Sequence, residues 1–301
     1  MQKIIPSLWF NKKADEAVNF YLSAFSEGKK SATYYYPKEG LADFQTEFAG
    51  QVLTIDFELL GYRFIAINAG SEFSPNPAIS FMVNFDPSID NQAQKNLDQL
   101  WEKLIVGGKV LMPLDTYPFS KHYGWVEDKY GISWQLILTD PAGQPRPQII
   151  PSLMFVTSSS DTAEQATEFY LSLFKNSKRG LLVRYPAGLE PNKQGSVMFT
   201  DFVLENQWFT AIDASASQHQ FSFNEAISLL INCKNQTEID YYWDKLTSDG
   251  GQESVCGWLK DKFGISWQVA PQAIDELVQN PKAFAKMMQM KKIIISDLNN
   301  T

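Results

Sequence analysis

Histidine and cysteine are scarce in this 301-residue chain, which contains two of each. Two cysteines make no disulfide framework, so Cys233 and Cys256 favour a reducing compartment, and we expect the protein in the cytoplasm. Basic residues are also in deficit, with 26 Lys and Arg against 34 Asp and Glu, giving a formal net charge of −8. This balance argues against nucleic acid as a partner.

Long apolar runs are missing as well. No segment approaches the roughly twenty apolar residues that span a bilayer, so we expect no membrane partner. The N-terminal MQKIIPSLWF lacks the apolar segment of a signal peptide, and we expect none. The chain is nevertheless 44% hydrophobic and 14% aromatic, which is ample for two buried cores.

Several phrases occur twice in the same order, which indicates a duplicated domain. IIPSLWF at 4–10 returns as IIPSLMF at 149–155, and FSPNPAISFMVN at 73–84 returns as FSFNEAISLLIN at 221–232. GWVEDKYGISWQ at 124–135 returns as GWLKDKFGISWQ at 257–268. We therefore divide the chain into a first repeat at 1–140, a proline-rich linker at 141–148, a second repeat at 149–271 and a C-terminal helical extension at 272–301.

The hydrophobic pattern of each repeat predicts a strand, a helix and three strands, twice over. In 12–25, for example, apolar residues recur at helical spacing, whereas QVLTIDFEL and YRFIAIN read as strands joined at Leu60-Gly61. One such segment leaves a sheet face apolar, so two are expected to pair around a shared core. The extension reads as an amphipathic helix that docks on its own repeat or on a second subunit.

These features resemble the vicinal oxygen chelate superfamily, the fold of glyoxalase and bleomycin-resistance proteins. The phrases PSLWF…EAVNFY, AISFMVN and GWVEDKYGISWQ are more similar to its PhnB-like branch, often labelled demethylubiquinone methyltransferase-like. The resemblance implies an α+β fold of two tandem modules, each a pair of βαβββ units forming a curled mixed sheet with flanking helices. It also implies that modules pair within the chain or across a homodimer. A glycine-rich adenosylmethionine loop opening a βαβ unit is not evident, so the sequence gives the methyltransferase label no mechanical support.

Metal-using relatives place ligands on the first, fifth and last strands of the fold. When the ligand positions of these relatives are transferred to this sequence, they fall at Pro6 and Pro151, at Ala78 and Ala226, and at Gln135 and Gln268. Proline and alanine side chains have no donor atom, and neutral glutamine is a weak ligand. We therefore expect neither a metal nor another cofactor.

The resemblance implies a concave groove, the default place for a small ligand. Since Trp134 and Gln135 must point to opposite faces of their strand, we expect Gln135 in the groove and Trp134 in the core. The aromatic residues among the pocket candidates could instead be ordinary core residues. Candidate pocket residues are Trp9, Phe81, Tyr117, Lys121, His122, Tyr123, Trp125 and Gln135 in the first repeat, and Met154, Leu229, Cys256, Trp258 and Gln268 in the second.

Two functions remain open from the sequence. The first is a metal-free protein that binds a small molecule, with Cys256 as a buried apolar side chain rather than a nucleophile. The alternative is an enzyme of the lyase or transferase kind that uses the loop at 111–124, where the first repeat is about ten residues longer than the second. That loop is read either as a functional lid or as an ordinary solvated connection. Catalytic residues are not identifiable.

Overall fold

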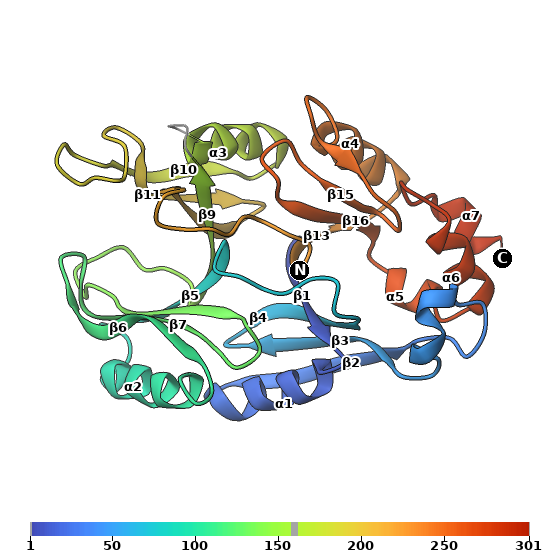
Figure 1. The fold of residues 1–301 in the computed structure, drawn as a ribbon, viewed down its shortest axis with the longest axis horizontal. Coiled ribbons are helices and arrows are strands. Elements are labelled where there is room, and N and C mark those ends of the chain that lie inside the picture. The colour runs from blue at the N-terminus through green and yellow to red at the C-terminus, as the bar shows by residue number, and fades with distance from the viewer. Residues whose placement is uncertain (1, 158–161, 301) are drawn as a thin grey trace. The chain divides into compact units, whose positions relative to one another are not determined.

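The computed structural model describes residues 2–157 and 162–300. Within these residues the strands form two eight-stranded mixed sheets with flanking helices (Figure 1). The predicted order of strand, helix and three strands is present at each of its four expected places along this described chain. The α+β class and the βαβββ units expected from the repeats are thus confirmed.

The four βαβββ segments follow one another along the chain, and three short helices end it. The first contains β1 (Ile4–Asn11), α1 (Ala14–Ala24), β2 (Gly28–Tyr35), η1 (Asp43–Phe48), β3 (Val52–Leu59) and β4 (Tyr62–Ala69). The second contains β5 (Ile79–Phe85), α2 (Ala93–Leu104), β6 (Lys109–Tyr117), β7 (Ser120–Glu127) and β8 (Ser133–Leu138). The third contains β9 (Ile149–Thr157), α3 (Thr162–Leu173), β10 (Lys178–Arg184), β11 (Val197–Leu204) and β12 (Gln207–Ser215). The fourth contains β13 (Ile227–Cys233), α4 (Gln236–Leu246), β14 (Gln252–Glu253), β15 (Trp258–Lys260) and β16 (Ser266–Pro271), and α5 (Ile274–Leu277), α6 (Pro281–Met288) and α7 (Ile295–Asn299) follow it.

The sheets cross the boundaries of the sequence repeats. β1 pairs antiparallel with β13, and β5 pairs antiparallel with β9, so each sheet joins one βαβββ segment from each repeat. The chain accordingly divides into a terminal unit, residues 1–74 and 223–301, and a central unit, residues 75–222. The repeats at 1–140 and 149–271 are therefore units of the sequence only. Each compact unit of the structure combines one half of the first repeat with one half of the second.

The recurring GWVEDKYGISWQ phrase is a hairpin organised by an aspartate. Asp128 is buried, its Oδ1 accepts hydrogen bonds from the backbone N–H groups of Tyr130 and Ile132, and its Oδ2 accepts one from Trp134 Nε1 at 2.8 Å. Asp261 makes the equivalent bonds in the second repeat, including one from Trp267 Nε1 at 2.8 Å. In each of the two repeats, one carboxylate therefore fixes both the turn and the buried tryptophan.

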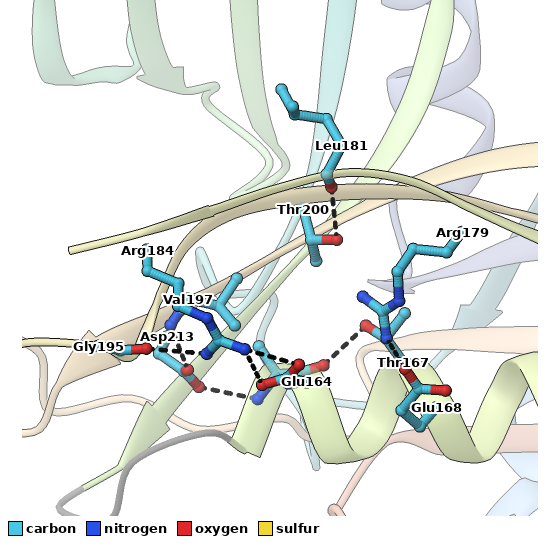
Figure 2. Close-up of polar contacts among 11 residues, drawn as sticks. Glu164, Thr167, Glu168, Arg179, Leu181, Arg184, Gly195, Val197, Thr200 and Asp213 are labelled. Carbon is cyan, nitrogen blue, oxygen red and sulfur yellow. Dashed lines mark hydrogen bonds and ion pairs between the residues drawn. The ribbon is translucent and has the colours of Figure 1, made fainter.

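Each unit has helices against one sheet face. In the central unit, α3 is tied to the neighbouring strands by side chains (Figure 2). Buried Asp213 accepts hydrogen bonds from the backbone N–H groups of Ala163 at 2.8 Å and Val197 at 2.9 Å, and Arg184 pairs with Glu164 at 2.7 Å. Exposed ion pairs contribute about 0–1 kcal/mol, so the buried aspartate dominates the positioning of this helix.

The C-terminal helices pack within the terminal unit. Phe284 of α6 and Val278 form one apolar cluster with Tyr36 and Phe48, both of which lie in the connection between β2 and β3. The extension thus docks on its own chain but not on its own repeat alone, because this cluster lies in the first repeat, while the N–H of Cys256 in the second repeat donates to the carbonyl oxygen of Met290. None of the helices in the described part of the chain combines the length and apolarity needed to cross a membrane.

Candidate functional site

In the terminal unit, the sheet face opposite α1 and α4 has a polar floor. Ser7 of β1 lies opposite Ser228 of β13, and Gln268 of β16 donates its Nε2 to Ser228 Oγ at 2.9 Å. Ser266 lies two residues before Gln268, so the strand pleat puts both on this face. Because Ser7 and Ser266 are each only 1% exposed, their hydroxyl groups are removed from bulk water.

A cavity of about 530 Å³ lies over this floor, entirely within the terminal unit. Its walls are mostly apolar and aromatic, which is typical of small-molecule sites. β1 contributes Trp9, β15 contributes Trp258, and η1 contributes Phe48. The ring centroids of Trp9 and Trp258 are 6.3 Å apart at an interplanar angle of 83°.

Polar atoms of the floor and wall lack protein partners. Among the described residues, Ser7 Oγ, Ser266 Oγ and Gln45 Oε1 are buried without a hydrogen-bond partner, and all three residues line the cavity. An unsatisfied buried polar group costs about 1–3 kcal/mol, so native proteins rarely retain one without a role. The three unsatisfied atoms therefore belong to residues that line one and the same cavity.

The C-terminal extension forms one wall. Met287 and Met288 of α6 line the cavity, and Cys256 Sγ lies 3.4 Å from Met288 Sδ. Backbone hydrogen bonds fix this wall, since the N–H of Cys256 donates to the carbonyl oxygen of Met290 at 2.7 Å. Burial raises the pKa of the Cys256 thiol to about 11, so the side chain is a neutral apolar group rather than a nucleophile.

A carboxyl group enters the same cavity from α5. Asp275 lines it and accepts a hydrogen bond from Thr54 Oγ1 at 3.0 Å. Burial raises the pKa of Asp275 to about 6, the Thr54 hydrogen bond opposes this, and the nearby Asp56 adds to it. The cavity wall therefore includes a half-buried, partly desolvated carboxyl group.

The equivalent face of the central unit is filled by its own side chains. Tyr123 donates its hydroxyl to Gln135 Oε1 at 2.8 Å, and Trp125 Nε1 donates to Ser133 Oγ at 2.7 Å. Both aromatic residues are buried in a cluster with Met154. Burial raises the pKa of Tyr123, which keeps it a neutral donor.

One exchange between the repeats accounts for much of this difference. Tyr123 and Cys256 both precede a Gly-Trp pair, so the shorter thiol stands where the central unit has a phenol. Cys256 also has a left-handed backbone, with φ of 59°, and Gly257 follows at 80°. Gln268 consequently keeps an Oε1 to which no described residue donates, whereas Gln135 Oε1 accepts a hydrogen bond from Tyr123.

The structure brings four predicted pocket residues together: Trp9, Cys256, Trp258 and Gln268 line the cavity. Phe81 and Leu229 need correction, because Ser80 and Ser228 face the floor side and strand alternation turns their neighbours to the helices. Phe81 packs against Trp134, and Leu229 lies beside Trp267. Leu230 is the residue of β13 that reaches the cavity.

The segment at 111–124 is a strand hairpin rather than a loop, formed by β6 and β7. Its polar side chains diverge. Lys121 is exposed, and His122 Nε2 lies 2.6 Å from Asp98 Oδ1 of α2. Tyr117 donates its hydroxyl hydrogen to the carbonyl oxygen of Pro113 and packs on Tyr123. Lys121, His122 and Tyr117 therefore do not converge on one point, and this arrangement does not support the alternative hypothesis of catalysis by the hairpin.

The position expected for a metal ligand on the first strand changes by one residue. Ser7, not Pro6, faces the cavity on the first strand, because Pro6 has the opposite parity in the pleat. Serine hydroxyls and neutral amides are weak ligands for a divalent ion. Among the described residues, no three His, Cys, Asp or Glu side chains lie close enough together to hold a metal.

Two matched serines test whether the floor is unsatisfied. Ser266→Ala should raise the free energy of unfolding of the ligand-free protein by about 1 kcal/mol, because it removes a buried hydroxyl without a partner. Ser133→Ala should lower the free energy of unfolding by about 1–2 kcal/mol, because the substitution leaves the indole N–H of Trp125 without its acceptor. Chemical denaturation of both variants measures the difference, and changes of the same sign would refute the assignment.

Sequence reasoning missed the serine floor and the contribution of the extension. The serines had a visible signal: PS or IS recurs at 6–7, 79–80, 132–133, 151–152, 227–228 and 265–266, in or at the start of an apolar strand, whereas the same pairs at 87–88 and 295–296 lie outside the strands. The extension had a weaker signal, apolar residues at 284, 287 and 288 on one helix face. Asp275 gave none, because its burial depends on tertiary packing.

Comparisons with known proteins agree with this architecture. Residues 2–137 and 147–270 match a family described as 3-demethylubiquinone-9 3-methyltransferase. The PhnB protein of Bacillus cereus is 36% identical over 46% of this chain and 100% of that chain, with a TM-score of 0.39. Protein PA1353 of Pseudomonas aeruginosa is 20% identical over 46% of this chain and 98% of that chain, with a TM-score of 0.38. No protein with a curated description matches.

A longer match reaches across both units. Glyoxalase I from Zea mays is similar over 92% of this chain and 95% of that chain, with 12% identity and a TM-score of 0.54. At this identity the likeness shows the fold alone. It supports the tandem arrangement inferred from the repeats.

Proposed function

This chain belongs to the PhnB-like family described as 3-demethylubiquinone-9 3-methyltransferase, and we propose that it binds one small organic molecule in the cavity of its terminal unit. The observation that supports this is the unsatisfied polar floor beneath apolar walls. Burying the hydroxyl groups of Ser7 and Ser266 without partners destabilises the folded protein. A ligand whose polar groups bind these hydroxyls would remove that destabilisation.

Shape and chemistry favour a molecule with an apolar body. About 530 Å³ accommodates a drug-sized ligand, and the rings of Trp9, Phe48 and Trp258 offer flat contact surfaces. We propose no binding at the equivalent face of the central unit, since Tyr123 and Trp125 occupy it. Methyl transfer stays outside the proposal, and the cytoplasmic location remains a prediction supported by the free Cys233 and Cys256.

Titration with N-phenyl-1-naphthylamine, a neutral fluorescent probe, tests the proposal. We expect saturable binding at one site per chain, weakened at least about tenfold by Trp9→Ala, because the probe loses an aromatic wall. Met154→Ala is the matched control, since Met154 holds the equivalent position in the central unit, and it should leave the affinity unchanged. Absence of saturable binding, or equal weakening by both variants, would contradict the proposal.

A further inference from the structure

We propose that the ligand is an apolar amine, bound as its cation with the ammonium group beside Asp275. This inference rests on the proposed function, because it names the class of molecule that the same cavity takes. It follows from the hydrogen-bonding character of the cavity, from its charges and from its rings.

The free polar atoms of the cavity are predominantly acceptors. Gln268 uses its Nε2 on Ser228, so its Oε1 is the atom left over, and no described residue donates to it. Gln45 Oε1 is likewise buried without a donor in the described chain. The hydroxyls of Ser7 and Ser266 can also accept. A ligand that satisfies these atoms must bring N–H or O–H groups.

The charges of the lining residues leave an excess of carboxylate. Glu225 pairs with Lys260 at 2.9 Å, which cancels both charges. Asp275 has no ion pair among the described residues, because the nearby Arg63 is held by Asp56 at 2.8 Å. A half-buried carboxylate without a counter-ion attracts a cation and repels a carboxylate or phosphate ligand.

The aromatic walls suit the same ligand. Trp9 meets Phe73 edge to face, with ring centroids 5.2 Å apart, and Tyr36 stacks on Phe48 at 5.2 Å. All four residues line the cavity. Faces of electron-rich rings attract an ammonium group and also bury an apolar body. Together, acceptors, carboxylate and rings select a hydrophobic cation over its neutral or anionic analogues.

Three probes with one ring system and different head groups test the inference: 1-naphthylmethylamine, 1-naphthalenemethanol and 1-naphthoic acid. Near pH 7 they are a cation, a neutral alcohol and an anion. By calorimetric titration we expect the amine to bind about tenfold more tightly than the alcohol, and the acid not to bind. Alcohol or acid binding as tight as that of the amine would overturn the amine inference and leave the proposed function standing. Failure of all three to bind would contradict both.

Variants of α5 identify the charged partner. Asp275→Asn should bring the amine to the affinity of the alcohol without changing the alcohol, because the amide keeps the shape and loses the charge. Glu276→Gln is the matched control, since it removes the same charge from an exposed neighbour outside the cavity, and it should preserve the preference. If both variants abolish the preference, or neither does, Asp275 is not the partner.

The pH dependence gives a second readout of the same group. Amine affinity should fall as the pH drops through about 6, where Asp275 takes up a proton, while alcohol affinity stays constant. A pH-independent preference would contradict the assignment. The groups that face or influence Asp275 are Tyr34 of β2, Thr54 and Asp56 of β3, Arg63 of β4 and Glu276 of α5.

Discussion

Replacing Phe284 with alanine should lower the free energy of unfolding by about 4 kcal/mol, because this truncation leaves a large hole in a buried cluster. Phe284 is 1% exposed, and its ring centroid lies 6.2 Å from that of Tyr36. It also anchors α6, which carries the methionine wall, so binding of the neutral probe should weaken as well. Urea denaturation and probe titration measure the two effects.

Phe44 provides the control for the loss of a ring. Its side chain is 69% exposed at the edge of the same cavity, so Phe44→Ala should change the free energy of unfolding by no more than about 0.5 kcal/mol. If Phe284→Ala destabilises the protein no more than Phe44→Ala, the extension is not part of the folded terminal unit.

Filling the cavity should abolish binding while the fold is retained. Ile67 lies on β4 beside Trp9, is only partly buried and lines the cavity. Ile67→Trp should place an indole in the open space and weaken binding of N-phenyl-1-naphthylamine at least about a hundredfold. The free energy of unfolding should change little, because the added side-chain volume enters space that is already free.

The duplicated sequence supplies a matched variant with the opposite pattern. Ile212 is the equivalent of Ile67 and packs against the aromatic cluster of the central unit. Since that space is filled, Ile212→Trp should cost about 1–3 kcal/mol through overpacking and leave probe binding intact. Equal loss of binding in both variants would show that the effect is not local to the cavity.

Much of the fold follows from the repeats. The duplicated GWVEDKYGISWQ phrase predicts the closing hairpins, and the alternation of Trp134 and Gln135 predicts which side chain faces the groove. The exchange of halves is not visible, because β1 and β13 are separated by more than two hundred residues and their pairing is set by tertiary contacts. The same limit explains Phe81 and Leu229, because their faces depend on the register of β5 with β9 and of β13 with β1.

The candidate site was predictable only in part. Trp9, Trp258 and Gln268 follow from the family resemblance, and the shorter side chain at Cys256 is visible in the alignment of the repeats. The sequence does not reveal that this exchange opens a cavity. The cavity also depends on the left-handed backbone at Cys256 and on a wall supplied by the extension. Asp275 enters the site only because α5 turns back over β3.

Native mass spectrometry of the protein taken from its own cells tests the central claim most directly. We expect one bound small molecule per chain, with a nitrogen-containing composition by accurate mass, present in the Ile212→Trp variant and missing from Ile67→Trp. Two molecules per chain, or equal occupancy in both variants, would contradict a single ligand site in the cavity of the terminal unit.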